Sequence, residues 1–231
     1  MDLNSKWRID RNSCSLCTKC VEECYADTMV IFGSKMTVSE VMEEVEKDKP
    51  FYSETNGGIT LSGGEPTLQI EFAHNLLLEC KRRGISTIIE TSGYFKWEKF
   101  EVLLSVLDYV LFDLKVYREK THIRYCGYSN RIILQNAQKL SKAFPNVIFR
   151  MPIIPKVNDD KQNIQLICQF VKKQGKKELH LIPYHKLGYG KYHMLGRQPS
   201  DKHIELADQK VQMKVKKLVE KEGLIPVLFF Q

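Results

Sequence analysis

The stretch Gly57-Gly58-Ile59-Thr60-Leu61-Ser62-Gly63-Gly64-Glu65-Pro66 decides the fold of this chain. Its apolar residues, Ile59–Leu61, are typical of a short strand, and the Gly63-Gly64 pair predicts a tight turn. The periodicity of Leu68–Arg83 predicts a helix that ends at Gly84, a residue suited to a helix C-cap. The unit is therefore a strand, a glycine turn and a helix, and the glycines let the backbone come close to a ligand.

The same alternation of strands and helices repeats along the rest of the chain. Further strands are expected at Ser86–Glu90, Tyr109–Leu114, Val147–Met151, Glu178–Ile182 and Pro226–Phe229. Further helices are expected at Val38–Lys47, Lys96–Ser105, Ile132–Ala143, Asp160–Gln174 and Ser200–Glu222. Near-continuous apolar strands are typical of a parallel sheet that is buried on both faces. Repeated β–α units without hairpin signals predict an α/β fold with an open or closed parallel barrel over residues 36–231.

Polar residues, glycines and prolines follow five of the expected strands, where a parallel barrel places its functional residues. These segments are Gly63-Gly64-Glu65-Pro66, Glu90-Thr91-Ser92-Gly93, Asp113-Leu114-Lys115, Arg150-Met151-Pro152 and Pro183-Tyr184-His185. Because parallel strands end at the same edge, the segments predict one shared pocket at one rim. Taken alone, each has a structural alternative: Glu65 would stabilise a helix N-terminus, and Asp113 with Lys115 would form an exposed ion pair of little energetic value.

A cluster of cysteines marks the first 33 residues. Four of the seven cysteines in the chain lie there, namely Cys14, Cys17, Cys20 and Cys24. The Cys-x2-Cys-x2-Cys-x3-Cys spacing is that of bacterial ferredoxins, whereas zinc, the alternative, usually joins two Cys-x2-Cys halves across a longer gap. Tyr25 stands where ferredoxins usually have proline, and in two-cluster ferredoxins the fourth cysteine ligates the other cluster. We therefore expect residues 1–33 to form an incomplete ferredoxin-like 4Fe-4S segment.

The composition narrows the class of protein. The chain has 231 residues, a formal net charge of +7 and 43% hydrophobic residues, which suits one medium domain with a small appendage. No apolar stretch reaches the ~18 residues of a membrane-spanning helix, and residues 1–10 lack the apolar core of a signal peptide. Lysine-rich segments at 172–177 and 210–221 have helical spacing, so we interpret them as solvated helix faces and expect no nucleic-acid partner. Clustered thiols without an export signal favour the cytoplasm.

In this order, the motifs resemble the activating enzymes of glycyl radical enzymes, the pyruvate formate-lyase activase family of radical S-adenosylmethionine (SAM) proteins. The resemblance covers about residues 8–229 and includes the segments at the strand ends. It also includes Met36-Thr37-Val38, Arg150-Met151-Pro152-Ile153-Ile154-Pro155, Val157-Asn158-Asp159, Leu181-Ile182-Pro183-Tyr184-His185-Lys186-Leu187-Gly188 and Lys191-Tyr192-His193-Met194-Leu195-Gly196. It implies a partial (β/α) radical-SAM-type barrel with parallel strands, preceded by the ferredoxin-like iron–sulfur segment.

The resemblance also implies roles for residues of this chain. The implied SAM-binding residues are Gly63, Gly64 and Glu65 at the amino group, the pair Asp113 and Lys115 with Lys115 suited to the carboxylate, and His185 near the ribose and adenine. The implied metal ligands are Cys14, Cys17, Cys20 and Cys24 for a 4Fe-4S cluster, and Glu90 with Thr91 for a monovalent cation. Close relatives have Asp-Thr at this last position, and the glutamate lengthens that ligand.

Proteins of this family use SAM and a 4Fe-4S cluster to generate a glycyl radical on a partner enzyme. The resemblance therefore implies an oxidoreductase of anaerobic metabolism that acts on a glycyl radical enzyme of the pyruvate formate-lyase type. It further implies a flavodoxin or ferredoxin-type reductant. The radical-generating cluster of the family needs a Cys-x3-Cys-x2-Cys loop. This sequence has none, because Asp27 stands where a third cysteine would follow Cys20 and Cys24.

The missing loop leads to the expectation that the chain is an N-terminally truncated activating enzyme, inactive as written and without catalytic residues of its own. Two other functions stay open. One is a SAM-binding or electron-transfer iron–sulfur protein without radical chemistry, which would bind SAM and form no 5′-deoxyadenosine. The other is a docking module, which would capture a glycyl radical enzyme without activating it.

Overall fold

The computed structural model describes residues 9–10, 12–195, 197–199 and 204–229. Its main feature is a six-stranded sheet whose strands lie side by side in sequence order. The strands are β1 (Gly58–Leu61), β2 (Ser86–Thr91), β3 (Tyr109–Asp113), β4 (Val147–Ile153), β5 (Glu178–Pro183) and β6 (Ile225–Leu228). All five neighbouring pairs are parallel, so each connection must cross back over the sheet. This confirms the expected α/β fold with parallel strands.

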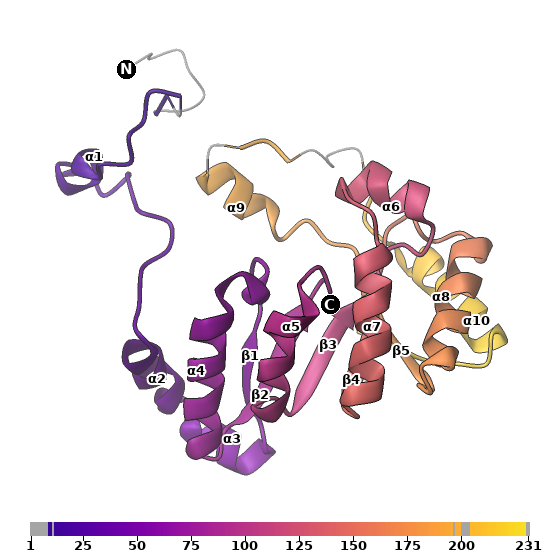
Figure 1. Cartoon of the computed structure of the whole chain (residues 1–231). Helices are drawn as coiled ribbons and strands as arrows, with labels where there is room; N and C mark the ends of the chain where they lie inside the picture. The colour runs from indigo at the N-terminus through magenta and orange to yellow at the C-terminus, as the bar shows by residue number, and fades with distance from the viewer. Residues whose placement is uncertain (1–8, 11, 196, 200–203, 230–231) are drawn as a thin grey trace. The chain divides into compact units, whose positions relative to one another are not determined.

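Helices lie before, between and beside these strands (Figure 1). They are α2 (Val38–Lys47), α3 (Lys49–Thr55), α4 (Ile70–Arg82), α5 (Trp97–Phe100), α6 (Glu119–Cys126), α7 (Arg131–Ala143), α8 (Lys161–Lys173) and α10 (Gln209–Lys221), with 3-10 helices η1 (Pro66–Gln69) and η2 (Glu101–Ser105). The short helices α3 and α6 were not expected from the sequence. Neither shows enough apolar periodicity to be distinguished from a loop.

Helix α2 has the bounds that its capping residues predict. Thr37 Oγ1 accepts a hydrogen bond from the Glu40 backbone N at 3.3 Å, and the Glu40 carboxylate accepts one from the Thr37 backbone N at 2.6 Å. This reciprocal pair satisfies two backbone donors that the first turn of a helix leaves free. The local sequence therefore determines where the helix starts.

Two expected helices begin later than the periodicity suggests. The helix expected at 68–83 is divided, because Pro66 opens the 3-10 helix η1 and the α-helix starts only at Ile70. The helix expected at 200–222 starts at Gln209, where the side chain of Asp208 accepts a hydrogen bond from the Val211 backbone N at 2.7 Å. Residues 200–203 lie outside the described part of the chain.

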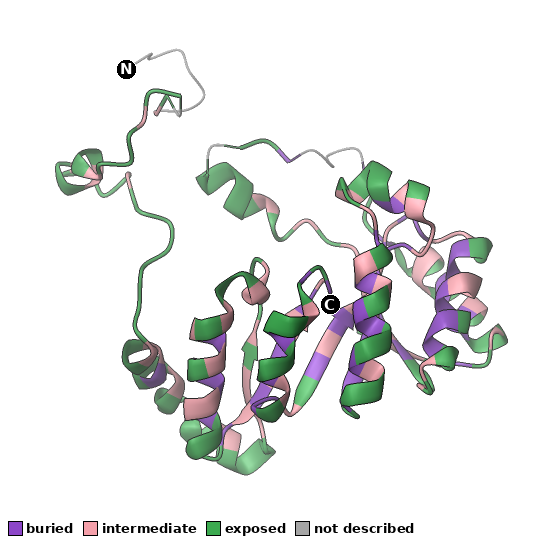
Figure 2. Ribbon diagram, in the orientation of Figure 1, coloured by how far each residue is buried: buried purple, intermediate pink, exposed green. Residues whose placement is uncertain are grey.

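The sheet has two different faces. In β2 through β5, buried and less buried residues alternate, as the pleat of a strand requires. The buried face packs against α4, α5 and α7, and Figure 2 shows buried residues along the strands and on the inner sides of these helices. This core includes Leu77, Ile89, Phe100, Val110, Phe112, Leu140 and Phe149. The other face of the sheet is half-buried and carries the charged residues described below.

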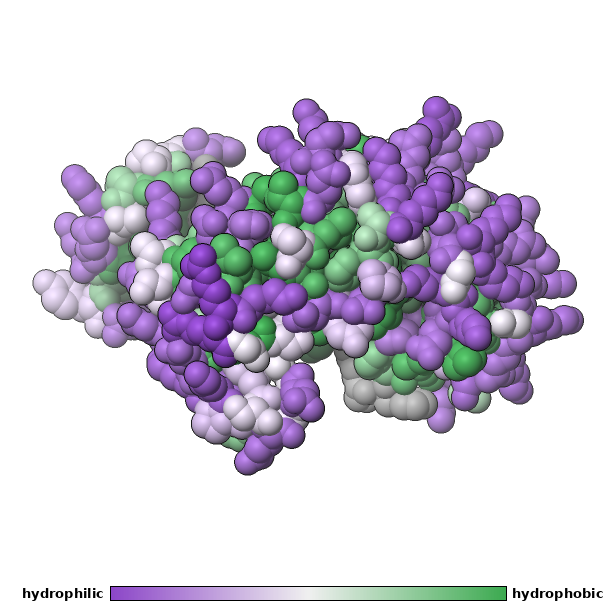
Figure 3. Space-filling model, turned by 60° about the horizontal axis from the view of Figure 1, so that its bottom comes forward, coloured by the Kyte–Doolittle hydropathy of each residue, from purple (hydrophilic) through white to green (hydrophobic). Residues whose placement is uncertain are grey.

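The chain divides into two compact units, residues 1–36 with 185–203 and residues 37–184 with 204–231. The sheet belongs to the second unit. Within its described residues, the first contains α1 (Lys19–Glu22) and α9 (Tyr189–Met194). Residues 185–203 were expected to belong to the barrel domain, 36–231. The expected roles of residues 1–33 as a ferredoxin-like segment and of residues 36–231 as a barrel stay predictions. None of the described helices combines the length and apolar character needed to cross a membrane. Figure 3 shows one face of the molecule, and hydrophilic residues cover much of it.

Candidate functional site at the carboxyl ends of the strands

Strand β1 ends in the Gly63-Gly64 turn. Gly63 has a φ of +107°, a conformation that residues with a Cβ rarely adopt. A Cβ on Gly63 or Gly64 would meet no atom within 4 Å, so the space around this turn is open. The backbone conformation therefore requires glycine at 63, and the exposed peptide groups of the turn are accessible to a ligand.

Glu65 connects this turn to the end of β2. Its Oε1 accepts hydrogen bonds from Thr91 Oγ1 and Thr67 Oγ1, both at 2.9 Å. Its Oε2 accepts hydrogen bonds from the Ser92 backbone N at 2.9 Å and from Ser92 Oγ at 2.6 Å. Both carboxylate oxygens are engaged within the protein, which makes Glu65 a brace between two strand ends. Its expected contact with an ammonium group stays a prediction.

Glu90 and Thr91, expected to hold a monovalent cation together, point to opposite faces of β2. Thr91 is 3% exposed and lies on the face that packs against the helices, whereas Glu90 lies on the half-buried face. Glu90 Oε2 accepts a hydrogen bond from Ser62 Oγ at 2.5 Å, and Arg150 Nη1 donates to Glu90 Oε1 at 2.6 Å. The structure therefore does not bring the Glu90 and Thr91 side chains together.

Asp113 and Lys115 line one cavity of about 250 Å³ at the end of β3. Its other walls come from the end of β2, from α6 and the loop after it, and from α7, and they are formed by Ser92, Tyr94, His122, Cys126, Tyr128 and Ile133. Two of these walls are aromatic and exposed: the ring centroids of Tyr94 and Tyr128 lie 5.5 Å apart. The structure thus brings the predicted Asp-x-Lys pair together in a single cavity with a partly aromatic lining.

The polar groups in this cavity are only partly satisfied by the protein. Burial raises the pKa of the Asp113 carboxyl, although the positive charges of Arg150 and Lys115 act in the opposite direction. Asp113 Oδ1 accepts a hydrogen bond from Arg150 Nε at 3.0 Å. Asp113 Oδ2 and Lys115 Nζ have no hydrogen-bond partner in the part of the chain that the structure describes. The cavity therefore offers one carboxylate oxygen and one ammonium group to a ligand.

Arg150 was expected at the shared rim, within the segment Arg150-Met151-Pro152, but without an individual role. It lies in β4, and its guanidinium reaches both Glu90 in β2 and Asp113 in β3. The available signal was a single arginine within the apolar strand Val147–Ile153, near strand ends that carry carboxylates. An arginine that is largely withdrawn from water usually needs such partners, so this pattern predicts an ion pair across neighbouring strands.

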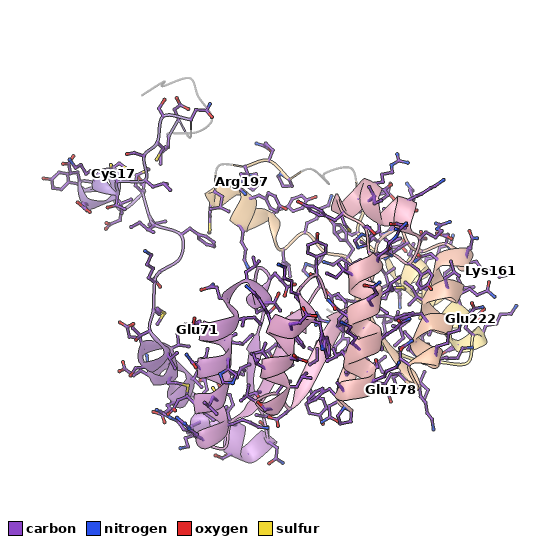
Figure 4. The ribbon with its side chains drawn as sticks, viewed as in Figure 1. Cys17, Glu71, Lys161, Glu178, Arg197 and Glu222 are labelled. Atoms are coloured by element: carbon purple, nitrogen blue, oxygen red, sulfur yellow. The ribbon has the colours of Figure 1, made fainter. Side chains whose placement is uncertain are left out.

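The cysteines of the N-terminal segment have suitable chemistry for an iron–sulfur cluster, but they are not gathered in the structure. The described residues contain no group of three or more His, Cys, Asp or Glu side chains that could hold a metal ion. Cys17, beside α1 in Figure 4, and Cys20 are exposed, and the other two are half-buried. A hydrogen bond from the Lys19 backbone lowers the pKa of Cys17, and one with Thr28 lowers that of Cys24. The metal-binding role stays a prediction.

His185 belongs to the compact unit formed by residues 1–36 and 185–203. The structure describes it as an exposed residue just beyond β5. Its expected place near a ribose and an adenine therefore stays a prediction, separate from the geometry of the Asp113–Lys115 cavity.

Comparison with known proteins relates these motifs to a large family. The model of the radical SAM superfamily matches residues 19–166. The isethionate sulfite-lyase activating enzyme of Desulfovibrio desulfuricans is 39% identical, covering 84% of this chain and 64% of that protein. The (2S)-3-sulfopropanediol dehydratase activating enzyme of Klebsiella oxytoca is 37% identical, covering 92% of this chain and 68% of that protein.

A solved structure supports the same relationship. A domain of pyruvate-formate lyase-activating enzyme from Bacteroides vulgatus has a TM-score of 0.62 at 25% identity, covering 75% of this chain and 99% of that one. The chain spans 64% and 68% of the two relatives named above. Gly63, Glu90, Asp113 and Lys115 all fall within the matched residues 19–166, whereas His185 lies beyond them.

Proposed function

The chain belongs to the radical SAM superfamily and, within it, to the activating enzymes of glycyl radical enzymes, and from that membership we propose that it binds SAM at the carboxyl ends of β1, β2 and β3. One observation carries this proposal. Asp113 and Lys115 line one cavity, and Asp113 Oδ2 and Lys115 Nζ have no hydrogen-bond partner among the described residues. The methionine end of SAM is a zwitterion, whose ammonium and carboxylate groups match this acceptor and this donor.

The neighbouring residues suit the same end of the ligand. The peptide groups of the Gly63-Gly64 turn are exposed and have open space around them, so they would contact a ligand without side-chain interference. Glu65 holds this turn against the end of β2 through Ser92, which itself lines the cavity. In this arrangement the peptide groups of the turn contact SAM, and Lys115 attracts the SAM carboxylate. Glu65 maintains the distance between the turn and the cavity of Asp113 and Lys115.

The family uses two cofactors, and the second of them, the iron–sulfur cluster, needs its own ligands in this chain. Superfamily members use SAM together with a 4Fe-4S cluster, which supplies the electron for radical chemistry when bound. Four thiols at ferredoxin spacing, Cys14 to Cys24, are a suitable donor set for one cluster. We propose that they ligate it after a rearrangement of the segment around α1, because the described residues contain no such group at present. The reductant would be a flavodoxin or ferredoxin-type protein.

The proposed partner is a glycyl radical enzyme. The relatives named above activate isethionate sulfite-lyase and (2S)-3-sulfopropanediol dehydratase, while the solved relative is named for pyruvate formate-lyase. Their names support a partner of this class, and the pyruvate formate-lyase type remains the finer proposal. A Cys-x3-Cys-x2-Cys loop does not occur in the 231 residues. We therefore propose that these residues bind SAM without cleaving it.

Titration of the chain with SAM under anaerobic conditions tests this function. The chain is loaded with iron and sulfide, and binding is followed by calorimetry. SAM is expected to bind, and 5′-methylthioadenosine, which lacks the amino-acid end, is expected to bind at least about tenfold more weakly, equivalent to 1.4 kcal/mol. Equal affinity for the two ligands would contradict binding through Asp113 and Lys115. Chromatography after addition of dithionite should show no 5′-deoxyadenosine, and its formation would contradict the second part of the proposal.

A further inference from the structure

Three neighbouring strands carry charged side chains on the half-buried face of the sheet. Glu90 is the last residue but one of β2, Asp113 ends β3, and Arg150 is the central residue of β4. Asp113 is the register partner of Arg150, and Glu90 is that of Leu111, two residues before Asp113. Because residues two apart in a strand point in the same direction, the three charged side chains share one side of the sheet.

Arg150 joins the two carboxylates. Its Nη1 lies 2.6 Å from Glu90 Oε1, and its Nη2 lies 2.9 Å from Asp113 Oδ1. The side chain of Arg150 is 14% exposed, and those of Glu90 and Asp113 are 29% and 24% exposed. Partial burial strengthens these attractions relative to those of surface pairs. A fixed positive charge therefore lies between two negative charges, beside the residues where a soluble cation was expected.

The donor atoms around Glu90 do not fit a soluble monovalent cation. Both oxygens of Glu90 are engaged, one by Arg150 and the other by Ser62 Oγ. Thr91 Oγ1 faces the opposite side of the sheet, where it donates to a carboxylate and accepts a backbone N–H at 3.0 Å. A cation placed beside Glu90 would also lie close to the guanidinium, and the two positive charges would repel each other.

We propose that Arg150 is a built-in counter-charge that takes the place of a soluble monovalent cation, so that the site at the ends of β2 and β3 works without Na⁺ or K⁺. A guanidinium stays protonated throughout the working pH range, and its fork holds two carboxylates at once. Arg150 is thus a positioning residue, which fixes Asp113 through Oδ1 and leaves Oδ2 for the ligand. The identity of that ligand rests on the proposed SAM function, whereas the charge balance of the three side chains does not.

The unaltered chain provides the first test. Its melting temperature without ligand and its dissociation constant for SAM are measured in KCl, NaCl and tetramethylammonium chloride, each at ~100 mM so that screening is equal. Melting should not be higher in KCl or NaCl, and the dissociation constants should agree within about twofold, less than 0.5 kcal/mol. Binding at least about fivefold tighter in KCl, nearly 1 kcal/mol, would overturn the proposal.

A failure of the proposed function gives a different result. Absence of SAM binding in all three salts would overturn SAM binding itself. The melting temperatures would still decide the role of Arg150, because they involve no ligand. Clearly higher melting in KCl than in tetramethylammonium chloride would show that the carboxylate pair needs a soluble cation.

Substitution of Arg150 provides the second test. Arg150→Met removes the counter-charge and is expected to weaken SAM binding about tenfold in tetramethylammonium chloride, equivalent to 1.4 kcal/mol. KCl should restore part of this affinity, because a soluble cation can then enter between Glu90 and Asp113. Arg150→Lys keeps the charge and should retain binding that does not depend on the salt, which keeps the test valid if the methionine variant does not fold. Wild-type affinity of Arg150→Met in all three salts would overturn the proposal.

Arg83 offers a matched control. It also joins two carboxylates, with Nη1 at 2.7 Å from Glu46 Oε1 and Nη2 at 2.8 Å from Glu79 Oε1. It follows α4 and precedes β2, so it lies at the amino end of that strand, away from the proposed site. Arg83→Met is expected to keep the wild-type affinity for SAM and the wild-type response to the three salts. A salt-dependent affinity in this control would mean that general stability, and not the position of Arg150, causes the effect.

Discussion

Glu65 and Ser92 join the turn after β1 to the end of β2 through two hydrogen bonds to one carboxylate oxygen. The Ser92 backbone N lies 2.9 Å and its Oγ 2.6 Å from Glu65 Oε2. Glu65 directly follows the Gly63-Gly64 turn, and Ser92 lines the cavity of Asp113 and Lys115. The contact therefore determines how far the open turn lies from the cavity.

Replacement of Glu65 by alanine should show the energetic weight of this brace. Glu65→Ala leaves the Ser92 and Thr91 donors without their acceptor, so the free energy of unfolding should fall by about 2–3 kcal/mol. Urea denaturation measures this change. The control Glu43→Ala alters an exposed residue of α2 and should change stability by less than about 0.5 kcal/mol. Equal effects of the two substitutions would show that Glu65 does not brace the strand ends.

Gly93 should not tolerate a side chain. It has a φ of +78°, and a Cβ at this position would overlap the ring of Phe112 in the core. Gly93→Ala is therefore expected to lower the free energy of unfolding by about 3 kcal/mol or more, from backbone strain and overpacking together. Gly84 has a φ of +70° but open space around it, so Gly84→Ala should cost only about 1 kcal/mol. Similar melting temperatures for the two variants would contradict this packing.

The cysteines should divide into two classes by reactivity. Burial raises the pKa of Cys80 to about 11 and that of Cys168 to about 12, and both side chains are 0% exposed. They should react with iodoacetamide only after unfolding, because the thiolate is the reactive form. The exposed Cys17 and Cys20 should react in the native chain, as mass spectrometry of the alkylated peptides would show.

Loading with iron and sulfide extends the same experiment. A cluster on the N-terminal thiols should protect Cys17 and Cys20 from alkylation, and removal of the iron by a chelator should restore their reactivity. Cys80 and Cys168 should not change in either step. Unchanged labelling of Cys17 and Cys20 after reconstitution would contradict the iron–sulfur proposal.

Glu90 should make the stability of the chain depend on pH. Burial alone would raise its pKa, but hydrogen bonds from Arg150 and Ser62 outweigh burial and hold the pKa below its ordinary value of 4.5. The unfolded chain therefore binds this proton more tightly, so the stability that Glu90 contributes is present above its unfolded pKa and is lost as pH falls through the folded pKa. Glu90→Gln should reduce the slope of unfolding free energy against pH below about pH 4.5. An unchanged slope would contradict the pairing with Arg150.

The strands were predictable from the sequence for a physical reason. Ile89, Val110 and Phe149 belong to the core between the sheet and the helices. Because each strand must contribute apolar side chains to this core, each shows as a short apolar segment in the sequence. The helix start at Thr37 was predictable as well, because a capping box acts between residues three apart. The start of α4 was not, since Pro66 first opens a 3-10 helix, and Leu68 within it has the sequence spacing of the apolar residues of α4 although its side chain is exposed.

The site was predictable as a set of strand ends but not as a network of contacts. Asp113 and Lys115 lie in one cavity because parallel strands and their following loops meet at one edge. The Glu90 and Thr91 side chains are separated because neighbouring residues of a strand point to opposite faces of the sheet. This separation was predictable from the sequence once Ser86–Glu90 was expected to be a strand. The role of Arg150 depends on the register between β3 and β4, and register is a long-range property that a single strand does not encode.

A SAM site at the carboxyl ends of these strands depends above all on the Lys115 ammonium group, so the decisive quantity is the affinity for SAM with and without this group. Equilibrium dialysis with labelled SAM would compare the unaltered chain with Lys115→Met and with Lys120→Met, an exposed residue of α6 that serves as the control. Lys115→Met is expected to weaken binding by at least about tenfold, equivalent to 1.4 kcal/mol, at an unchanged melting temperature, while Lys120→Met binds like the unaltered chain. Equal binding by all three chains, or no binding by the unaltered chain, would contradict a SAM site at the carboxyl ends of these strands.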